Sequence, residues 1–110
     1  HAHAVHVQRT DGLDGNGMRA LADQLRDKMK SGVIALGAAT GGDKVSLLVV
    51  VTKDLIGTIK AGELIKALAT EVGGTGGGRP EMAQAGGKDP AKLDAALEKV
   101  FSLVETTLQR

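Results

Sequence analysis

One glycine-rich stretch, residues 73–87, restricts the folds open to this chain more than any other feature. It reads Gly-Gly-Thr-Gly-Gly-Gly-Arg-Pro-Glu-Met-Ala-Gln-Ala-Gly-Gly, so that seven glycines surround a single arginine, Arg79. Glycine lets backbone N–H groups approach a ligand closely, at a cost in conformational entropy. A flexible linker would favour serine or charge, whereas here Pro80 restricts the backbone of Arg79. We therefore expect an ordered loop that binds a ligand, with a surface linker as the alternative.

The composition favours one globular domain with an aliphatic core. The chain has 110 residues, of which 42% are hydrophobic and 25% are charged, and this length suits a single core. Phe101 is the only aromatic residue, so a platform for stacking bases is absent. The net charge of +1 neither indicates nor excludes a nucleic-acid partner, so any phosphate contacts must come from local clusters of basic residues.

Several features of the sequence bear on the cellular compartment and on membrane contact. The chain has no cysteine, which excludes disulfides and agrees with a reducing cytoplasm. The longest apolar run, residues 45–51, is far too short to span a membrane, and no signal peptide is visible. We expect a cytoplasmic protein without membrane contact, and a first residue that is not methionine suggests a piece of a longer chain.

Three histidines near the start raise the alternative of a metal site. His1, His3 and His6 are not accompanied by a carboxylate before Asp11, and terminal histidines are usually solvated. We therefore expect no metal site.

Hydrophobic periodicity predicts a mixed sheet packed with helices. The predicted elements are, in order, a strand at residues 4–9, a helix capped by Asp14 and ended by Gly32, a hairpin of strands at residues 33–39 and 44–52, a helix at residues 61–72, a short strand at residues 82–85 and a closing helix that begins at Asp89-Pro90. Residues 45–51 are apolar on both faces, so this strand should be central, with residues 73–87 packed across its end or beside a neighbouring edge. This order predicts an α/β class, close to α+β, with about four to five strands and three helices.

Four blocks of the sequence resemble one known family. Val-Thr-Lys-Asp-Leu (51–55), Ala-Gly-Glu-Leu-Ile-Lys (61–66), the glycine-rich stretch (73–87) and Lys-Asp-Pro-Ala-Lys-Leu (88–93) are similar to the C-terminal domains of alanyl-tRNA synthetases. The similarity covers nearly everything after the first strand. It implies a fold of the DHH-associated-domain type.

The same wider group supplies an alternative. It also contains the substrate-binding halves of RecJ-like nucleases and small-RNA phosphodiesterases, in which the block runs Gly-Gly-Gly-His and the histidine contacts substrate. Here the position is Arg79, and the chain has no Asp-His-His motif. The synthetase branch is therefore favoured, with the substrate-binding half of a DHH-family nucleotide or oligonucleotide phosphoesterase as the alternative and a purely structural interaction domain as the third.

The resemblance implies a non-catalytic RNA-binding module. Residues 1–110 would form one domain of a longer synthetase chain, and this domain would help hold the outer corner of the tRNA for alanine during aminoacylation and editing. Its expected partners are that tRNA and the rest of the synthetase. We expect no catalytic residue and no cofactor in this fragment, because ATP, magnesium and zinc would belong to upstream domains. An upstream helical segment contributes to dimer formation in this family, so the fragment is expected to be monomeric.

The expected nucleic-acid-binding residues lie in or beside loops, where phosphate contacts are normally placed. They are Lys53, Lys60, Gly76, Gly77, Gly78, Arg79 and Gln84. Arg79 can pair with a phosphate, stack on an exposed base, or brace the loop against Asp54 or Glu81. The two lysines have the alternative of being solvated loop charges.

Overall fold

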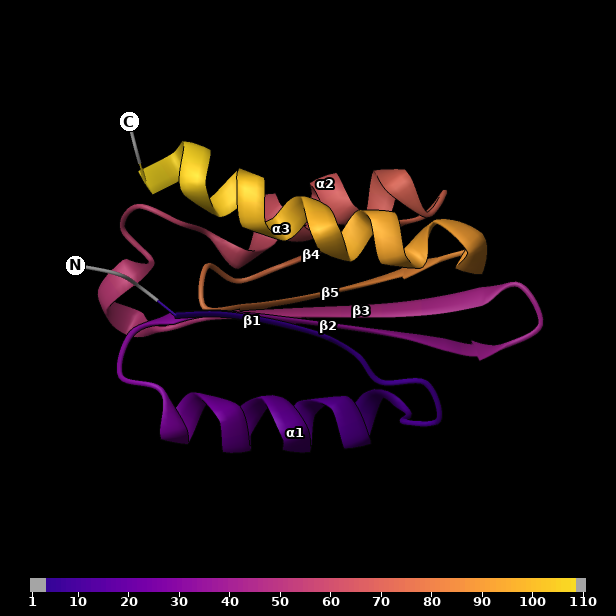
Figure 1. The fold of residues 1–110 in the computed structure, drawn as a ribbon, viewed down its shortest axis with the longest axis horizontal. Helices are drawn as coiled ribbons and strands as arrows, with labels where there is room; N and C mark the ends of the chain where they lie inside the picture. Colours follow the sequence, from indigo (N-terminus) through magenta and orange to yellow (C-terminus); the bar gives the residue numbers. More distant parts are fainter. Residues whose placement is uncertain (1–3, 109–110) are drawn as a thin grey trace.

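The computed structural model describes residues 4–108, which form one five-stranded mixed sheet and three α-helices (Figure 1). The elements are β1 (Ala4–Arg9), α1 (Gly15–Lys28), β2 (Gly32–Gly41), β3 (Lys44–Val51), α2 (Ala61–Glu71), β4 (Thr75–Gly78), β5 (Met82–Gly87) and α3 (Leu93–Leu108), with 3₁₀ turns at Lys53–Leu55 and Pro90–Lys92. This architecture confirms the predicted class. The expectations for His1 and His3 lie outside the described residues.

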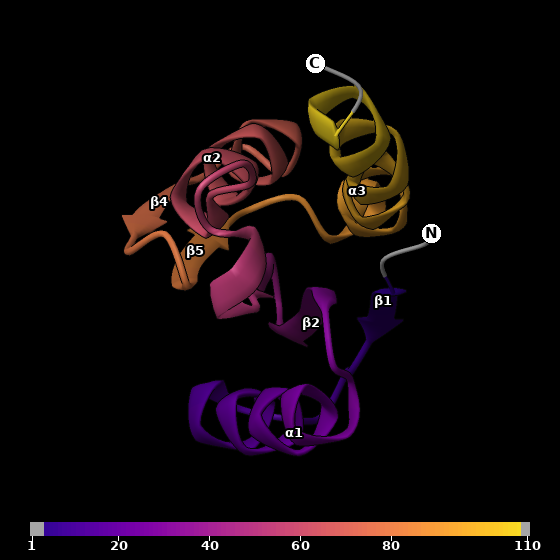
Figure 2. The same cartoon turned by 90° about the vertical axis from the view of Figure 1, so that its left-hand side faces the viewer.

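Helices cover both faces of the sheet. Figure 2 shows α1 below the strands and α2 with α3 above them. Successive side chains of a strand point to opposite faces, so Leu47 and Val49 of β3 join the larger core under α2 and α3, while Leu48 and Val50 join the smaller core over α1. This two-sided burial explains why β3 is apolar on both faces.

The sheet order β1-β2-β3-β5-β4 confirms that β3 is central. It is antiparallel to β2 on one side and to β5 on the other. The hairpin between β2 and β3 turns through Gly41 and Gly42, whose φ angles of 110° and 56° are conformations that glycine adopts readily. β1 pairs with β2 in parallel, and α1 makes the crossover between them.

Gly32 does not end the first helix as predicted. The helix begins where expected, because the Asp14 side chain accepts a hydrogen bond from Gly17 N at 2.8 Å. It ends at Lys28, and Gly32 is instead the first residue of β2. A Cβ at Gly32 would overlap the carbonyl oxygen of Ala4, so this glycine allows the close parallel pairing of β1 with β2.

The glycine-rich stretch is a β-hairpin rather than a loop. The predicted strand at residues 82–85 is present as the longer β5, but β4 was not predicted. β5 pairs along β3 from Val45↔Gly87 to Val50↔Met82, so the stretch extends the sheet at its edge and does not cross the end of β3.

The closing helix also starts differently from the prediction. Asp89 makes no side-chain capping hydrogen bond, and Pro90–Lys92 form a 3₁₀ turn before α3 begins at Leu93. The buried face of α3 is as expected, since Ala96, Val100 and Val104 lie in the larger core. No helix within the described residues is long and apolar enough to cross a membrane.

Candidate nucleic-acid interface

Two loops that are distant in sequence lie together at one end of the sheet. The segment after β3 and the turn between β4 and β5 both lie at the left in Figure 1. Two backbone hydrogen bonds join them, since Ala61 N donates to Pro80 O at 2.8 Å and Val51 N donates to Glu81 O at 3.0 Å. Arg79 N donates to Met82 O at 2.9 Å and closes the turn. The backbone thus fixes where Arg79 is presented.

The Arg79 side chain extends into solvent. It is 81% exposed, and its Nη1 lies 3.9 Å from Glu81 Oε2, a separation at which an exposed pair contributes little. Of the two predicted braces, Asp54 has other partners, because its carboxylate accepts hydrogen bonds from Thr52 Oγ1 at 2.6 Å and Ser31 Oγ at 2.5 Å. The guanidinium is therefore available to a bidentate anion such as a phosphate.

Lys53 lies on the α1 side of this end of the sheet. It opens the 3₁₀ turn after β3 and is exposed. It lines an open pocket of about 780 Å³, whose lining residues are Arg26, Met29, Lys30, Val51, Thr52, Lys53, Asp54 and Glu81. Lys53 thus shares a concave surface with basic residues of α1 and of the segment after it.

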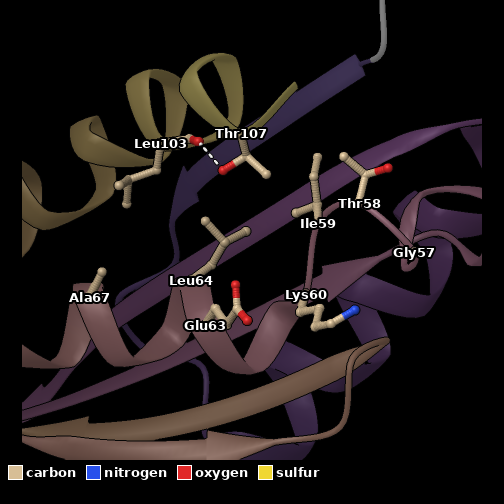
Figure 3. Close-up of a pocket in the computed structure, with 9 residues that line it drawn as sticks. All are labelled: Gly57, Thr58, Ile59, Lys60, Glu63, Leu64, Ala67, Leu103 and Thr107. Carbon is tan, nitrogen blue, oxygen red and sulfur yellow. Dashed lines mark hydrogen bonds between the residues drawn. The ribbon is translucent and has the colours of Figure 1, made fainter. Parts of the chain in front are cut away.

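Lys60 lies in a different place. It precedes α2, and its Nζ donates to Ile56 O at 3.1 Å. Figure 3 shows it at the rim of a pocket of about 420 Å³ into which Leu64 of α2 and Leu103 of α3 project. Since α2 and α3 cover the face opposite α1, the structure does not bring Lys60 into the pocket that Lys53 lines.

The three candidate glycines are not equivalent. A Cβ at Gly76 would overlap Ala85, and one at Gly78 would lie 2.6 Å from Met82 O. A Cβ at Gly77 would meet nothing within 4 Å. Of these three, only Gly77 thus has room for a side chain, while Gly76 and Gly78 are required by the close packing of the hairpin.

Gln84 lies opposite Gly77 in the pairing of β4 with β5. Its Oε1 accepts a hydrogen bond from Arg19 Nη2 of α1 at 3.0 Å. Gly77, Arg79 and Gln84 line one shallow pocket of about 350 Å³, together with Gly78, Met82 and Ala83. The structure thus unites these three predicted residues on the α1 side of the sheet.

Sequence reasoning missed the basic residues of the α1 region. Arg19, Arg26 and Lys30 line pockets on the same side of the sheet as Lys53 and Gln84. Arg19 and Arg26, seven residues apart, lie on one flank of α1, and Lys30 follows the end of the helix. The spacing of the two arginines is readable from the sequence once charged residues as well as apolar ones are tested for periodicity.

Nothing in this region suggests a metal centre. Within residues 4–108, no group of three or more His, Cys, Asp or Glu side chains is placed to hold a metal ion. The clear carboxylate pKa shifts occur elsewhere: a hydrogen bond from Arg9 lowers the pKa of Asp11, and one from Lys99 lowers the pKa of Glu71. The exposed guanidinium and ammonium groups of this region can bind anions.

The family of the chain follows from comparison with known proteins. Residues 3–106 match the family model described as the DHHA1 domain, and the chain belongs to this family. Among its relatives are an alanine–tRNA ligase of Shewanella amazonensis, 55% identical over 96 residues, and one of Anaeromyxobacter dehalogenans, 56% identical over 104 residues. These alignments cover 87% and 94% of this chain but 11% of each ligase.

A solved structure supports the same relationship. The C-Ala domain of alanyl-tRNA synthetase from Aquifex aeolicus superposes with a TM-score of 0.80 at 31% identity, covering 87% of this chain and 86% of that domain. The fold and the predicted resemblance to alanyl-tRNA synthetase C-terminal domains are thereby confirmed. The relatives favour the synthetase branch over the phosphoesterase alternative.

Proposed function

We propose that this chain is the C-terminal RNA-binding module of an alanyl-tRNA synthetase and helps hold the outer corner of the tRNA for alanine during aminoacylation and editing. One observation carries the proposal: a rigidly tied hairpin turn presents the exposed Arg79 close to Gly77, where a side chain would meet only open space. The match to the C-Ala domain supports it. The module acts in the cytoplasm as a monomeric unit, joined to the remainder of the synthetase.

Phosphate contacts supply most of the binding free energy in this proposal. Phe101 is the only aromatic residue and lies on α3, so base stacking contributes little. With Lys53 and Arg79 as phosphate ligands, the logarithmic salt dependence has a slope of about −1.5 to −2. A contact from the uncharged backbone at Gly77 adds affinity without adding to this slope. The dissociation constant falls at about 10⁻⁴ to 10⁻⁶ M, and neighbouring domains that hold the same tRNA raise the effective affinity.

The module works without a cofactor of its own. ATP and magnesium serve the aminoacylation chemistry of upstream domains, and zinc likewise belongs there.

The experiment is a titration of labelled tRNA for alanine at 50 and 200 mM salt. Arg79→Ala flattens the salt slope by about one unit, because one phosphate contact is lost. Gly77→Val prevents the backbone from meeting the RNA but, given the open space there, leaves the thermal melt unchanged. Lys44→Ala serves as the matched charge control, since Lys44 is exposed at the opposite end of β3 from Lys53.

Lys60→Ala tests the extent of the site, and we expect it to bind like the parent because Lys60 lines the pocket between α2 and α3. If Arg79→Ala and Gly77→Val both bind like the parent, the assignment of the site is wrong although the family stands. If the parent fails to bind tRNA at 50 mM salt, RNA binding itself is wrong.

A further inference from the structure

A row of positive charge runs along one flank of α1 and just beyond it. Arg19, Arg26 and Lys30 are exposed, and at 3.6 residues per turn the first two lie about 20° apart around the helix. From Arg19 to Arg26 the row is about 10 Å long, and Lys30 follows two residues after the end of the helix. Lys28 lies about 180° from Arg19 on the opposite flank, so the row belongs to one side of the helix.

This flank faces β5. Arg19 Nη2 donates to Gln84 Oε1 at 3.0 Å, and Arg26 and Lys30 line a pocket together with Glu81, the residue before β5. The side of α1 nearest the outer strands therefore carries the row, although α1 itself packs on β2 and β3 through Met18 and Ala22.

Three hollows lie along the space between α1 and β5. Arg19 and Gln84 line one of about 160 Å³, and Gln84 also lines the hollow of Gly77 and Arg79. The third is separate and is lined by Arg26, Lys30 and Lys53 together with Glu81, the residue before β5. We call these three hollows together the α1–β5 groove.

The α1–β5 groove is more basic than the chain as a whole. Its described cations are Arg19, Arg26, Lys30, Lys53 and Arg79, and the carboxylates beside them are Asp23, Asp54 and Glu81. Asp23 pairs with Arg26 at 3.1 Å in an exposed ion pair, which a phosphate can replace because such pairs are weak. Asp54 is held by hydroxyl groups.

The groove fits a phosphate backbone better than bases. Its described lining contains no aromatic side chain, and Phe101 lies on α3, on the other side of the sheet. Arg26, Lys30, Lys53 and Arg79 lie toward the end of the sheet where β3 ends and the β4–β5 hairpin turns, and Arg19 lies farther along β5 beside Gln84. Cations at more than one place along the groove suit the repeating charges of a nucleic-acid strand.

We propose that the flank of α1 forms the second wall of the RNA site, so that the phosphate backbone of a folded RNA runs along the α1–β5 groove and passes Arg79 at the hairpin turn. This inference rests on the proposed function and extends it to Arg19, Arg26 and Lys30. Gln84 acts as a positioning residue, because its hydrogen bond holds the Arg19 guanidinium across the groove.

The test measures the salt slope of tRNA binding for single variants of this wall. The parent slope is steeper than −3, because the α1 flank adds contacts to those at the turn. Each of three single substitutions flattens the slope by about one unit: Arg19→Gln, Arg26→Gln and Lys30→Gln. When salt rises from 50 to 200 mM, the factor by which affinity falls is therefore about three-fold smaller for each variant than for the parent. Lys28→Gln, on the opposite flank, binds like the parent.

Gln84→Met tests positioning without changing the charge of the groove. It removes the acceptor that holds the Arg19 guanidinium, so the variant binds tRNA more weakly than the parent. Adding Gln84→Met to Arg19→Gln causes no further loss of affinity, because both changes act on the same contact. Additive losses of affinity in the double variant contradict the positioning role.

The outcomes separate this inference from the proposed function. If only the turn binds RNA, Arg79→Ala weakens tRNA binding, whereas the three wall variants and Lys28→Gln all bind like the parent. In that case the α1 wall is wrong and the proposed function stands. If Lys28→Gln and Arg26→Gln lose equal tRNA affinity, the binding reflects general charge attraction, and the proposal that α1 forms a wall of the site is wrong. A parent that binds no tRNA overturns both.

Discussion

Gly76 and Gly77 are neighbours in β4 with opposite requirements. A side chain at Gly76 would overlap Ala85 across the hairpin, whereas Gly77 faces open space. The difference arises because successive residues of a strand point to opposite faces. One glycine is therefore needed for folding, and the other is free to serve a ligand.

Alanine at each of these two positions should separate the roles by stability. Gly76→Ala is expected to cost about 1–3 kcal/mol, because the hairpin must shift to relieve the overlap. Gly77→Ala should change the free energy of unfolding by less than about 1 kcal/mol, or raise it slightly through the unfolded state. Urea unfolding followed by circular dichroism measures both. Equal destabilisation by the two substitutions would contradict the assignment of Gly77 as an open position.

The sequence predicted the candidate residues of the interface but not which of them lie together on one surface. Lys53 and Lys60 belong to one connecting segment and looked equivalent, yet they line different pockets. The intervening 3₁₀ turn and the start of α2 decide the direction of each side chain, and neither is encoded by charge or spacing. For the same reason the roles of Gly76, Gly77 and Gly78 depend on strand register.

At the scale of elements, strong periodicity was informative and short polar or glycine-rich pieces were not. β3 and α2 carry uninterrupted apolar patterns, and both were predicted within a residue or so. β4 was missed because Thr-Gly-Gly-Gly has little intrinsic strand preference; pairing with β5 supplies its order. Gly32 was assigned to a helix end because sequence does not show that β1 passes against it.

The end of β1 is fastened to β2 by one carboxylate. Asp11 Oδ1 accepts hydrogen bonds from Arg9 Nε and from Ala39 N, each at 2.9 Å. The hydrogen bond from Arg9, followed by that from Ala39, lowers the pKa of Asp11. The folded state therefore takes up a proton at this carboxyl less readily than the unfolded chain.

Asp11 should make stability depend on pH in acid. Its stabilising contribution is complete above about pH 4 and is lost as the pH falls through the folded pKa. Thermal melts of the parent and of Asp11→Asn between pH 7 and pH 2.5 measure this. We expect the parent to be more stable at pH 7 and the gap to narrow in acid; a constant gap across the range would show that the charge of Asp11 is not involved.

At the scale of the whole molecule, the sheet is wider than the helix on its lower face. α1 packs against β2 and β3, so β5 and β4 extend beyond it and leave the α1–β5 groove. The upper face is covered by α2 and α3. The asymmetry was not predictable from the sequence, because the position of each helix depends on the sheet order.

We expect this chain not to cleave nucleic acid. The expectation rests on the resemblance, which implies a histidine in the phosphodiesterase branch at the position that Arg79 occupies here. Short oligonucleotides incubated with the purified protein and manganese should remain intact on a denaturing gel. Cleavage that survives repurification and disappears in Arg79→Ala would overturn the expectation and revive the phosphoesterase alternative.

The two cores of unequal size imply that the molecule does not open as one unit. The smaller core holds α1 against the sheet through a few side chains such as Met18 and Ala22, so α1 can detach while the sheet and the other two helices stay folded. Its amide protons would then exchange with solvent earlier than those of β3. If α1 is also a wall of the RNA site, RNA binds only molecules in which α1 is docked on the sheet. Bound RNA would then slow amide exchange in α1 and leave exchange in the other elements unchanged.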